Sequence, residues 1–347
     1  MRAAPVTAPE LTQETTPDMT TATATATTAT ATAPGPATAS GSATAPGSAG
    51  GLDPRLAELE AESIDIIRQT AGQFDRPALL FSGGKDSVLV LELAKRAFAP
   101  APVPLELLHV DTGHNFPEVL EFRDKVAAQP GITLRVAKVQ DWIDRGVLTE
   151  RADGTRNPLQ TVPLVETIAE AGYDAVLGGA RRDEEKARAK ERVFSVRDSF
   201  GGWDPRRQRP ELWGLYNGRH AAGENVRVFP ISNWTEADVW AYIAARGIEL
   251  PPIYFTHERE VFNRGGMWLA PGEWGGPRDD EKVEVRRVRY RTVGDMSCTG
   301  AVESTAATIA AVQEDLRTST LTERGAPRAA ATLSESSMED RKKEGYF

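Results

Sequence analysis

Apolar and polar residues alternate between residues 52 and 177 in two rhythms, one helical and one typical of short buried strands. Apolar residues recur at helical spacing over residues 54–71, where Asp53 can cap a helix that has Pro54 in its first position. Short apolar stretches then alternate with longer amphipathic ones. The pattern predicts strands at residues 78–81, 105–110, 132–139 and 175–177, and helices at residues 87–98, 117–128 and 162–171.

Strands that alternate with helices of this length are typical of βαβ units. The sequence therefore predicts an α/β fold built on a mostly parallel, doubly wound sheet. Ligands of such sheets bind at the carboxyl ends of the strands. We expect functional residues in the turns that follow the predicted strands.

The pattern beyond residue 200 is less regular. Thr235 is placed to cap an amphipathic helix that Gly247 ends. Residues 282–293 alternate charged and apolar side chains, as a strand with one wet face does. We predict an α/β domain over residues 52–234 and a separate C-terminal region over residues 235–347.

Residues 1–51 have a different composition from the rest of the chain. From about Thr20 to Gly51 the sequence is nearly all Ala, Thr, Pro, Gly and Ser, without apolar periodicity. Such a segment buries too little to compensate for the entropy lost on ordering. We expect a disordered extension and no signal peptide, because a basic start and an apolar core are both lacking.

Composition excludes several classes of protein. The 347 residues include 41 Lys or Arg and 50 Asp or Glu, for a net charge of -9. This balance argues against binding of nucleic acid through bulk charge, although a local basic pocket for a small anion is compatible with it. No apolar run approaches the roughly 20 residues of a membrane span. One cysteine, Cys298, cannot form an internal disulfide, which fits a reduced, cytoplasmic protein.

The stretch FSGGKDS, residues 81–87, lies between a predicted strand and a predicted helix. Two glycines let the backbone turn tightly and present N–H groups, and the helix adds the positive end of its dipole. A lysine and two serines supply a cation and hydroxyl groups, which together make a cradle for pyrophosphate. The spacing is not that of a Walker loop. The alternative is a plain glycine turn with Lys85 in solvent. The residues assigned to this loop, called the phosphate loop below, are Ser82, Gly83, Gly84, Lys85, Asp86 and Ser87.

This loop resembles the PP-loop of the ATP pyrophosphatase superfamily, whose members cleave ATP between the α and β phosphates. Six further stretches resemble a single family: LLHVDTG, GGARRDEEKARAKER, WDPRRQRPELW, VFPISNWTEADVW, TGAVES and the final GYF. Over residues 52–347 the chain is similar to the small, catalytic subunit of heterodimeric bacterial sulfate adenylyltransferase (ATP sulfurylase). This family belongs to the phosphoadenylyl-sulfate reductase-like group of PP-loop proteins.

The resemblance implies that ATP and sulfate react to give adenylyl sulfate and pyrophosphate, the first step of sulfate assimilation. Sulfate is fully ionised near neutral pH, so its attack on the α-phosphorus needs no general base and no organic cofactor. The site should be a clamp of Arg, Lys, backbone N–H groups and Mg²⁺. The reaction runs uphill, and family members couple it to GTP hydrolysis by a separate large subunit. We expect that GTPase to dock on residues 235–347.

Arg181 and Arg182 follow the fourth predicted strand and two glycines, at the sheet edge expected for the phosphate loop. One guanidinium group can bind two oxygens of a phosphate or sulfate group at once. We therefore assign Lys85, Arg181 and Arg182 as catalytic. Arg181, Arg182 and, more weakly, Arg209 are assigned to sulfate. The alternative is that the two adjacent arginines belong to a solvated helical face.

Asp111 and Gly113 follow the second predicted strand, a region that the family uses for nucleotide. Asp86 and Asp111 are candidate ligands of Mg²⁺. Alternatively, Asp111 caps a turn and Asp86 is a partner of the helix dipole. His109 lies inside an apolar strand, which favours a hydrogen-bonded core residue. Cys298 is expected to be buried and structural.

Two other functions remain open. A phosphoadenylyl-sulfate reductase shares the fold and the loop, but it needs a nucleophilic thiol near its carboxyl end in an E-C-G-x-H setting. The sequence MEDRKKEGYF at residues 338–347 contains no cysteine. A non-catalytic nucleotide-binding subunit would bind ATP without exchanging pyrophosphate into it.

Overall fold

The computed structural model describes residues 51–151, 154–184, 186–273 and 275–318. The extension predicted for residues 1–51 lies outside them except for Gly51, as does the final GYF stretch. Helix α1 (Pro54–Gln73) begins where the sequence predicts, because the Asp53 carboxylate accepts a hydrogen bond from the Arg55 N–H at 2.9 Å.

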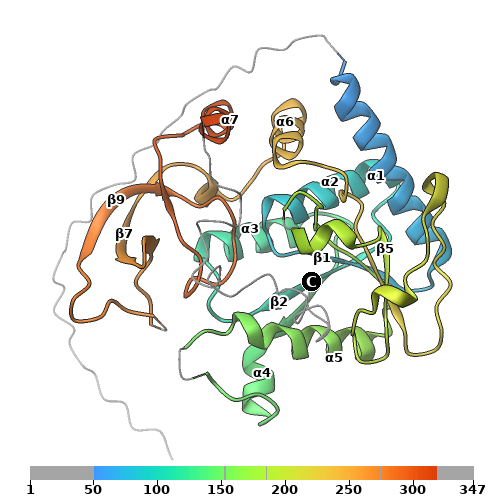
Figure 1. The fold of residues 1–347 in the computed structure, drawn as a ribbon, viewed down its shortest axis with the longest axis horizontal. Coiled ribbons are helices and arrows are strands. Elements are labelled where there is room, and N and C mark those ends of the chain that lie inside the picture. The colour runs from blue at the N-terminus through green and yellow to red at the C-terminus, as the bar shows by residue number, and fades with distance from the viewer. Residues whose placement is uncertain (1–50, 152–153, 185, 274, 319–347) are drawn as a thin grey trace, which may run out of the picture. The chain divides into compact units, whose positions relative to one another are not determined.

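A six-stranded sheet in the order β3-β2-β1-β4-β6-β5 lies at the centre of the described residues (Figure 1). From β3 to β6 neighbouring strands are parallel, and only β5 runs antiparallel to its neighbour β6. The chain adds strands on both sides of β1, so the mostly parallel, doubly wound sheet is confirmed. The strands are β1 (Pro77–Leu80), β2 (Glu106–Asp111), β3 (Leu134–Lys138), β4 (Ala175–Leu177), β5 (Phe194–Arg197) and β6 (Asn225–Val228).

Helices cover both faces of this sheet (Figure 1). On one face Leu79 and Leu177 join the larger apolar core, which includes residues of α1, α2 and α3. On the other face Ala78 and Val176 join a smaller cluster with Leu164 of α5. The α-helices after α1 are α2 (Lys85–Phe98), α3 (Pro117–Ala127), α4 (Val139–Asp144), α5 (Thr161–Ala171), α6 (Glu236–Arg246) and α7 (Ile309–Thr318). The 3₁₀ turns are η1 (Asn157–Gln160), η2 (Lys186–Lys190), η3 (Pro205–Arg207), η4 (Leu212–Gly214) and η5 (Pro252–Tyr254).

Local signals placed several boundaries correctly and missed others. Thr235 caps α6, and the left-handed Gly247, with φ of 61°, ends it. The strand predicted over residues 132–139 is shorter, because Val139 begins α4. Strands β5 and β6 were not predicted.

A second sheet, antiparallel and four-stranded in the order β10-β9-β7-β8, follows in the chain. Its strands are β7 (His257–Arg264), β8 (Met267–Leu269), β9 (Val283–Arg289) and β10 (Val302–Glu303). The sequence predicted only the strand at residues 282–293, which the structure shortens to β9. Strand β7 begins with four polar residues, HERE, so its pattern lacks the apolar alternation that marks a strand.

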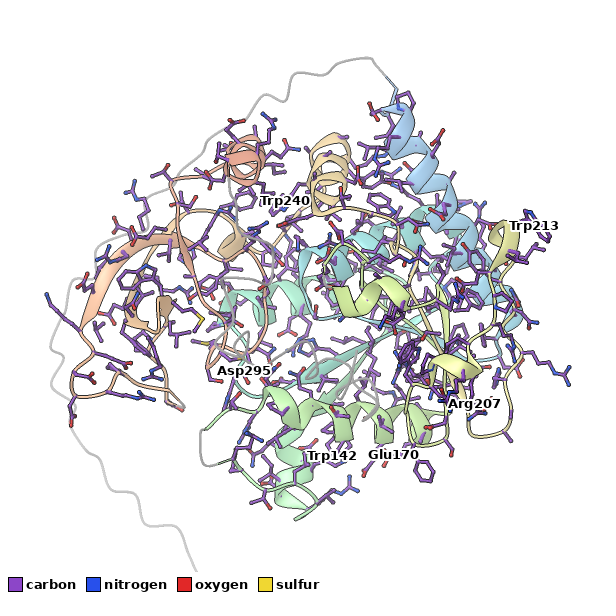
Figure 2. All side chains as sticks on the ribbon, viewed as in Figure 1. Trp142, Glu170, Arg207, Trp213, Trp240 and Asp295 are labelled. Atoms are coloured by element: carbon purple, nitrogen blue, oxygen red, sulfur yellow. The ribbon has the colours of Figure 1, made fainter. Side chains whose placement is uncertain are left out.

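One apolar core extends across the division that the sequence predicts between residues 234 and 235. Trp234, Tyr242 and Val261 belong to the same buried cluster. Trp240 of α6 is buried as well, whereas Trp213 is 89% exposed (Figure 2). The division into two functional regions stays a prediction. In the described part of the chain, no helix combines the length and the apolar character that a membrane crossing requires.

Asp238 joins α6 to α1. Its carboxylate accepts hydrogen bonds from Arg55 Nε and Nη2, each at 2.8 Å, and from the Thr235 N–H at 2.9 Å. These contacts, the Arg55 hydrogen bonds above all, lower the pKa of Asp238 to about 2. A carboxyl group with a depressed pKa stabilises the fold above its unfolded pKa of about 4, and this contribution is lost as the pH falls towards 2.

We expect Asp238→Asn to lower the free energy of unfolding at pH 7 by about 1 kcal/mol, since Arg55 is exposed and water screens the pair. The variant should also lose the part of the pH dependence that Asp238 supplies between about pH 4 and pH 2. Urea unfolding at a series of pH values measures both effects. Glu58→Gln, an exposed position on α1, is the control. An identical pH profile for wild type and Asp238→Asn would contradict this role.

Candidate active site

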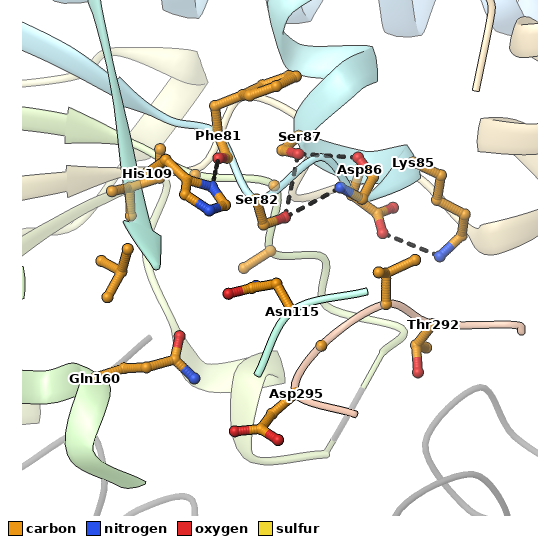
Figure 3. A pocket seen from close by; sticks show the side chains of 18 of the residues that line it. Phe81, Ser82, Lys85, Asp86, Ser87, His109, Asn115, Gln160, Thr292 and Asp295 are labelled. Carbon is orange, nitrogen blue, oxygen red and sulfur yellow. Dashed lines mark hydrogen bonds and ion pairs between the residues drawn. The ribbon is translucent and has the colours of Figure 1, made fainter. Parts of the chain in front are cut away.

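A pocket lies where the carboxyl ends of β1, β2 and β4 meet the amino end of α2 (Figure 3). The phosphate loop forms one wall, and the turn of residues 178–180 after β4 forms another. Residues 292–295, which follow β9, line the pocket on a further side. The pocket therefore occupies the sheet edge that the sequence predicts. Of the predicted site residues, those that line it are Ser82, Gly84, Lys85, Asp86 and Ser87.

The strand, turn and helix expected around the phosphate loop are confirmed. Gly83 has a φ of 75°, and a Cβ there would lie 2.8 Å from Val119 Cγ1, so the turn requires glycine. Gly84 is the N-cap of α2 and provides no side-chain cap. The positive end of the helix dipole faces the pocket, which favours an anion, although Ser82 Oγ accepts the Gly84 N–H at 3.2 Å and Tyr254 Oη accepts the Lys85 N–H.

Lys85 is 1% exposed, so the alternative that it lies in solvent is wrong. Its Nζ lies 3.0 Å from Asp86 Oδ2. The other oxygen of this carboxylate, Oδ1, accepts a hydrogen bond from Arg181 Nε at 3.0 Å. Asp86 therefore holds two buried cations, one on its own helix and one from the turn after β4.

Arg181 and Arg182 have different surroundings although they are adjacent. Arg181 is 1% exposed and also donates to Asp183, at 2.8 Å, so it does not belong to a solvated helical face. It does not itself line the pocket and reaches it through Asp86. Arg182 is half-buried and contacts Asn233.

Arg209 lies further along the chain and donates to the backbone oxygen of Asn217 at 2.9 Å. Neither Arg182 nor Arg209 lines the pocket. Their predicted roles, catalysis and sulfate binding for Arg182 and sulfate binding for Arg209, therefore have no support in where the structure places them.

Asp111 is the last residue of β2 and Gly113 lies in the turn that follows; neither lines the pocket. Asp111 Oδ1 accepts the Gly113 N–H at 2.8 Å, and its Oδ2 lies 3.3 Å from Arg123 Nη1. These contacts fit the turn-capping alternative.

The contacts of Asp86 and Asp111 do not fit direct ligation of Mg²⁺, because all four carboxylate oxygens already have donor partners. In the described ranges no group of three or more His, Cys, Asp or Glu residues is placed to hold a metal ion. Mg²⁺ at these two residues stays a prediction, and no step below depends on it.

Of the two expectations for His109 and Cys298, the structure confirms one. His109 Nδ1 lies 2.8 Å from the backbone oxygen of Phe81, and burial lowers the pKa of His109. The prediction of a hydrogen-bonded, buried histidine is therefore confirmed. The expectation of a buried Cys298 is wrong, because this residue is only half-buried. Its Sγ lies 3.7 Å from the backbone oxygen of Asp295.

Several pocket residues were missed by the sequence reasoning. Tyr254 Oη accepts the Lys85 N–H at 2.8 Å and so fixes the first residue of α2. Asn115 and Asp295 face the pocket in Figure 3. Asp295 Oδ2 lies 3.6 Å from His114 Nδ1, and burial lowers the pKa of this histidine. The one available signal was that the TGAVES stretch follows Asp295 closely in the chain.

Residues 76–301 match the model of the phosphoadenosine phosphosulfate reductase domain family. The chain is also 72% identical over 289 residues to sulfate adenylyltransferase subunit 2 of Streptomyces lavendulae, covering 83% of this chain and 91% of that protein. The chain belongs to the sulfate adenylyltransferase subunit 2 family. The resemblance stated from its motifs is confirmed, and the protein is a nucleotidyltransferase.

A second member of the sulfate adenylyltransferase subunit 2 family, from Mycolicibacterium gilvum, is 60% identical over 292 residues, which cover 84% of this chain and 94% of that one. Among solved structures, phosphoadenylyl-sulfate reductase from Candida auris matches with 20% identity and a TM-score of 0.39. It covers 58% of this chain and 91% of that one.

Gly179 provides a test of the contact between the two pocket walls. A Cβ at this position would lie 2.9 Å from Asp86 Cβ and 3.1 Å from the Ser87 backbone nitrogen. We expect Gly179→Ala to displace the phosphate loop, weaken ATP binding by about 10-fold or more and lower the free energy of unfolding by about 1–3 kcal/mol. Calorimetric titration with ATP and thermal unfolding measure these effects.

Gly72→Ala is the matched control, since a Cβ there meets nothing within 4 Å. Wild-type ATP affinity in Gly179→Ala would show that the turn and the loop are not in the contact described here.

Proposed function

We propose that this chain transfers the adenylyl group of ATP to sulfate, giving adenylyl sulfate and pyrophosphate. The observation that carries the proposal is the conjunction, at one pocket, of a glycine turn, the amino end of helix α2 and a buried lysine. These groups suit a pyrophosphate that must be held and released as an anion. Membership of the sulfate adenylyltransferase subunit 2 family supports the choice of acceptor.

In this reaction a sulfate oxygen attacks the α-phosphorus of ATP. The bond between the α-phosphorus and the bridging oxygen breaks, and its electron pair leaves with pyrophosphate. No proton is transferred, so the neutral His109 in the pocket wall needs no role as a base. Lys85 stabilises the negative charge that develops on the leaving group. Asp86 holds the Lys85 ammonium in place, and Arg181 holds Asp86.

The apolar part of the pocket lining suits the base of the nucleotide. Leu80, Val110 and Leu164 line the pocket, and Asn157 and Gln160 add polar groups to the lining. An apolar wall with a few polar groups is typical of sites for planar ligands. ATP would then extend from the apolar wall to the phosphate loop.

A separate GTPase subunit completes the proposal, because the anhydride of adenylyl sulfate is more reactive than the bond broken in ATP and binding alone does not shift that equilibrium. The name subunit 2 of the relatives supports a partner chain. Exposed Val283 and Val285 on β9 support docking on the C-terminal region. We place the complex in the reducing cytoplasm, in keeping with the single cysteine.

We expect Lys85→Ala to lower the rate of sulfate-dependent exchange of pyrophosphate into ATP by about 100-fold or more, because the charge opposite the leaving group is lost. The exchange is measured with radioactive pyrophosphate and with the partner subunit present. Lys95→Ala on the same helix is the control, since Lys95 pairs with Glu92 far from the pocket. Exchange at the wild-type rate in a folded Lys85→Ala protein would refute the assignment.

The second candidate function is a thiol-dependent reductase, favoured by the family model that matches residues 76–301 and by the half-buried Cys298 near the pocket. The two functions predict different results for Cys298→Ser. Adenylyl transfer uses no thiol, so we expect this variant to keep the wild-type rate of adenylyl sulfate formation within about 2-fold. Release of sulfite that depends on a thiol donor and disappears in Cys298→Ser would establish the reductase instead.

A further inference from the structure

One face of the central sheet changes from apolar to charged at its antiparallel edge. In β4 this face carries Val176, which packs in the smaller apolar cluster. The residue beside it in β6 is Arg227, and the residue opposite Arg227 in β5 is Ser195. Arg197 lies two residues further along β5, on the same face as Ser195. Arg197 and Arg227 are each 1% exposed.

A third buried guanidinium comes from the segment between β4 and β5. Arg188 is 4% exposed and lines the pocket together with the turn of residues 178–180. The charge of Arg188 acts on Arg197, and that of Arg197 acts on Arg227. Arg188, Arg197 and Arg227 are called the arginine cluster below. It adjoins the pocket at Arg188.

The ion pairs of Arg188 and Arg197 leave part of the hydrogen-bonding capacity of these two residues unused. Glu191 accepts a hydrogen bond from Arg197 Nη2 at 2.7 Å, whereas Glu184 Oε2 lies 3.3 Å from Arg188 Nε in an ion pair that makes no hydrogen bond. Yet Nε and Nη1 of both Arg188 and Arg197 are buried and have no hydrogen-bond acceptor in the described part of the chain. Buried N–H groups without acceptors destabilise the fold unless a bound ligand supplies the missing acceptors.

The charge balance of this region also favours an anion. The three guanidinium groups are buried, Glu184 and Glu191 form ion pairs with two of them, and the charge of Asp198 also acts on Arg197. Burial and the neighbouring Arg197 lower the pKa of Arg227 to about 9. A further positive charge is therefore disfavoured here, whereas an oxyanion would stabilise all three cations.

We propose that the arginine cluster binds the sulfate that accepts the adenylyl group, with Arg188 at the junction between sulfate and nucleotide. Sulfate is a tetrahedral dianion with acceptor oxygens only, which matches guanidinium nitrogens that have donors only. Gly179 contacts Asp86 on the phosphate loop, so the turn that precedes Arg188 brings this anion site next to the phosphates. The inference rests on the proposed function. It assigns the sulfate to the arginine cluster in place of Arg182 and Arg209.

The cluster also suits a phosphate group of ATP, and steady-state kinetics of the full chain with its partner subunit distinguish the two oxyanions. Arg188→Gln removes the guanidinium at the pocket. We expect it to raise KM for sulfate by about 10-fold or more and to leave KM for ATP within about 2-fold. Glu184→Gln is the matched control, because it breaks the same ion pair but removes a competing anion, so KM for sulfate should stay or fall.

An unchanged KM for sulfate in Arg188→Gln would overturn the proposal. So would a rise in KM for ATP alone, which would assign the cluster to a phosphate of the nucleotide. An equal rise of the sulfate KM in Glu184→Gln would assign Arg188 a structural role, also against the proposal. If Arg188→Gln does not fold, Arg188→Lys takes its place, because it keeps the charge without the paired donors. It should raise the sulfate KM several-fold, and an unchanged sulfate KM in Arg188→Lys would overturn the proposal.

Direct binding separates this inference from the function on which it rests. Calorimetric titration of the full chain with inorganic sulfate, in the presence of a non-hydrolysable ATP analogue, should show binding that Arg188→Gln weakens by about 10-fold or more. If wild type binds sulfate in this way but forms no adenylyl sulfate with its partner, the proposed function fails and the anion site stands. If wild type forms adenylyl sulfate and Arg188→Gln binds sulfate as wild type does, the anion site fails alone.

Discussion

The arrangement of this site depends on a single carboxylate that is shared by two buried cations. Asp86 contacts Lys85 on α2 and Arg181 after β4, so it joins segments that are 95 residues apart in the sequence. Without the carboxylate, two positive charges would face each other away from water, and breaking such a buried network is strongly destabilising. The same contact holds Gly179 against the loop. The fold thus brings two strand ends together, and one ionic bridge fixes the distance between the walls of the pocket.

The sequence predicts the features that local chemistry decides. Helical and strand periodicities give the βαβ units, and the glycines with Lys85 locate the phosphate loop between a strand and a helix. Contacts between distant segments decide the rest. Arg181 and Arg182 look equivalent in the sequence, but only Arg181 turns inward to Asp86, because neighbouring side chains after a strand end point in different directions. Strand β7 was missed since its charged residues hide the alternation, and the buried arginines of β5 and β6 carry no local signal, because arginine usually indicates a surface.

The C-terminal region contributes residues to the pocket and also has exposed apolar residues on β9. Residues 292–295 line the site and are separated by two residues from β9, the strand whose Val283 and Val285 are exposed. Tyr254, from the segment between α6 and β7, fixes the first residue of α2. A protein that binds along β9 would therefore contact the strand that leads into the pocket-lining residues, which offers a short physical route between a bound protein and the phosphate loop.

The residue at position 179 indicates whether a related sequence keeps the local geometry of this site. The space beside Asp86 and Ser87 accepts a hydrogen atom and nothing larger without movement of the backbone. A homologue with any other residue here must have rebuilt either the turn after its fourth strand or the start of its second helix. This one position therefore serves as a simple filter for sorting diverged members of the superfamily into those that retain this geometry and those that have abandoned it.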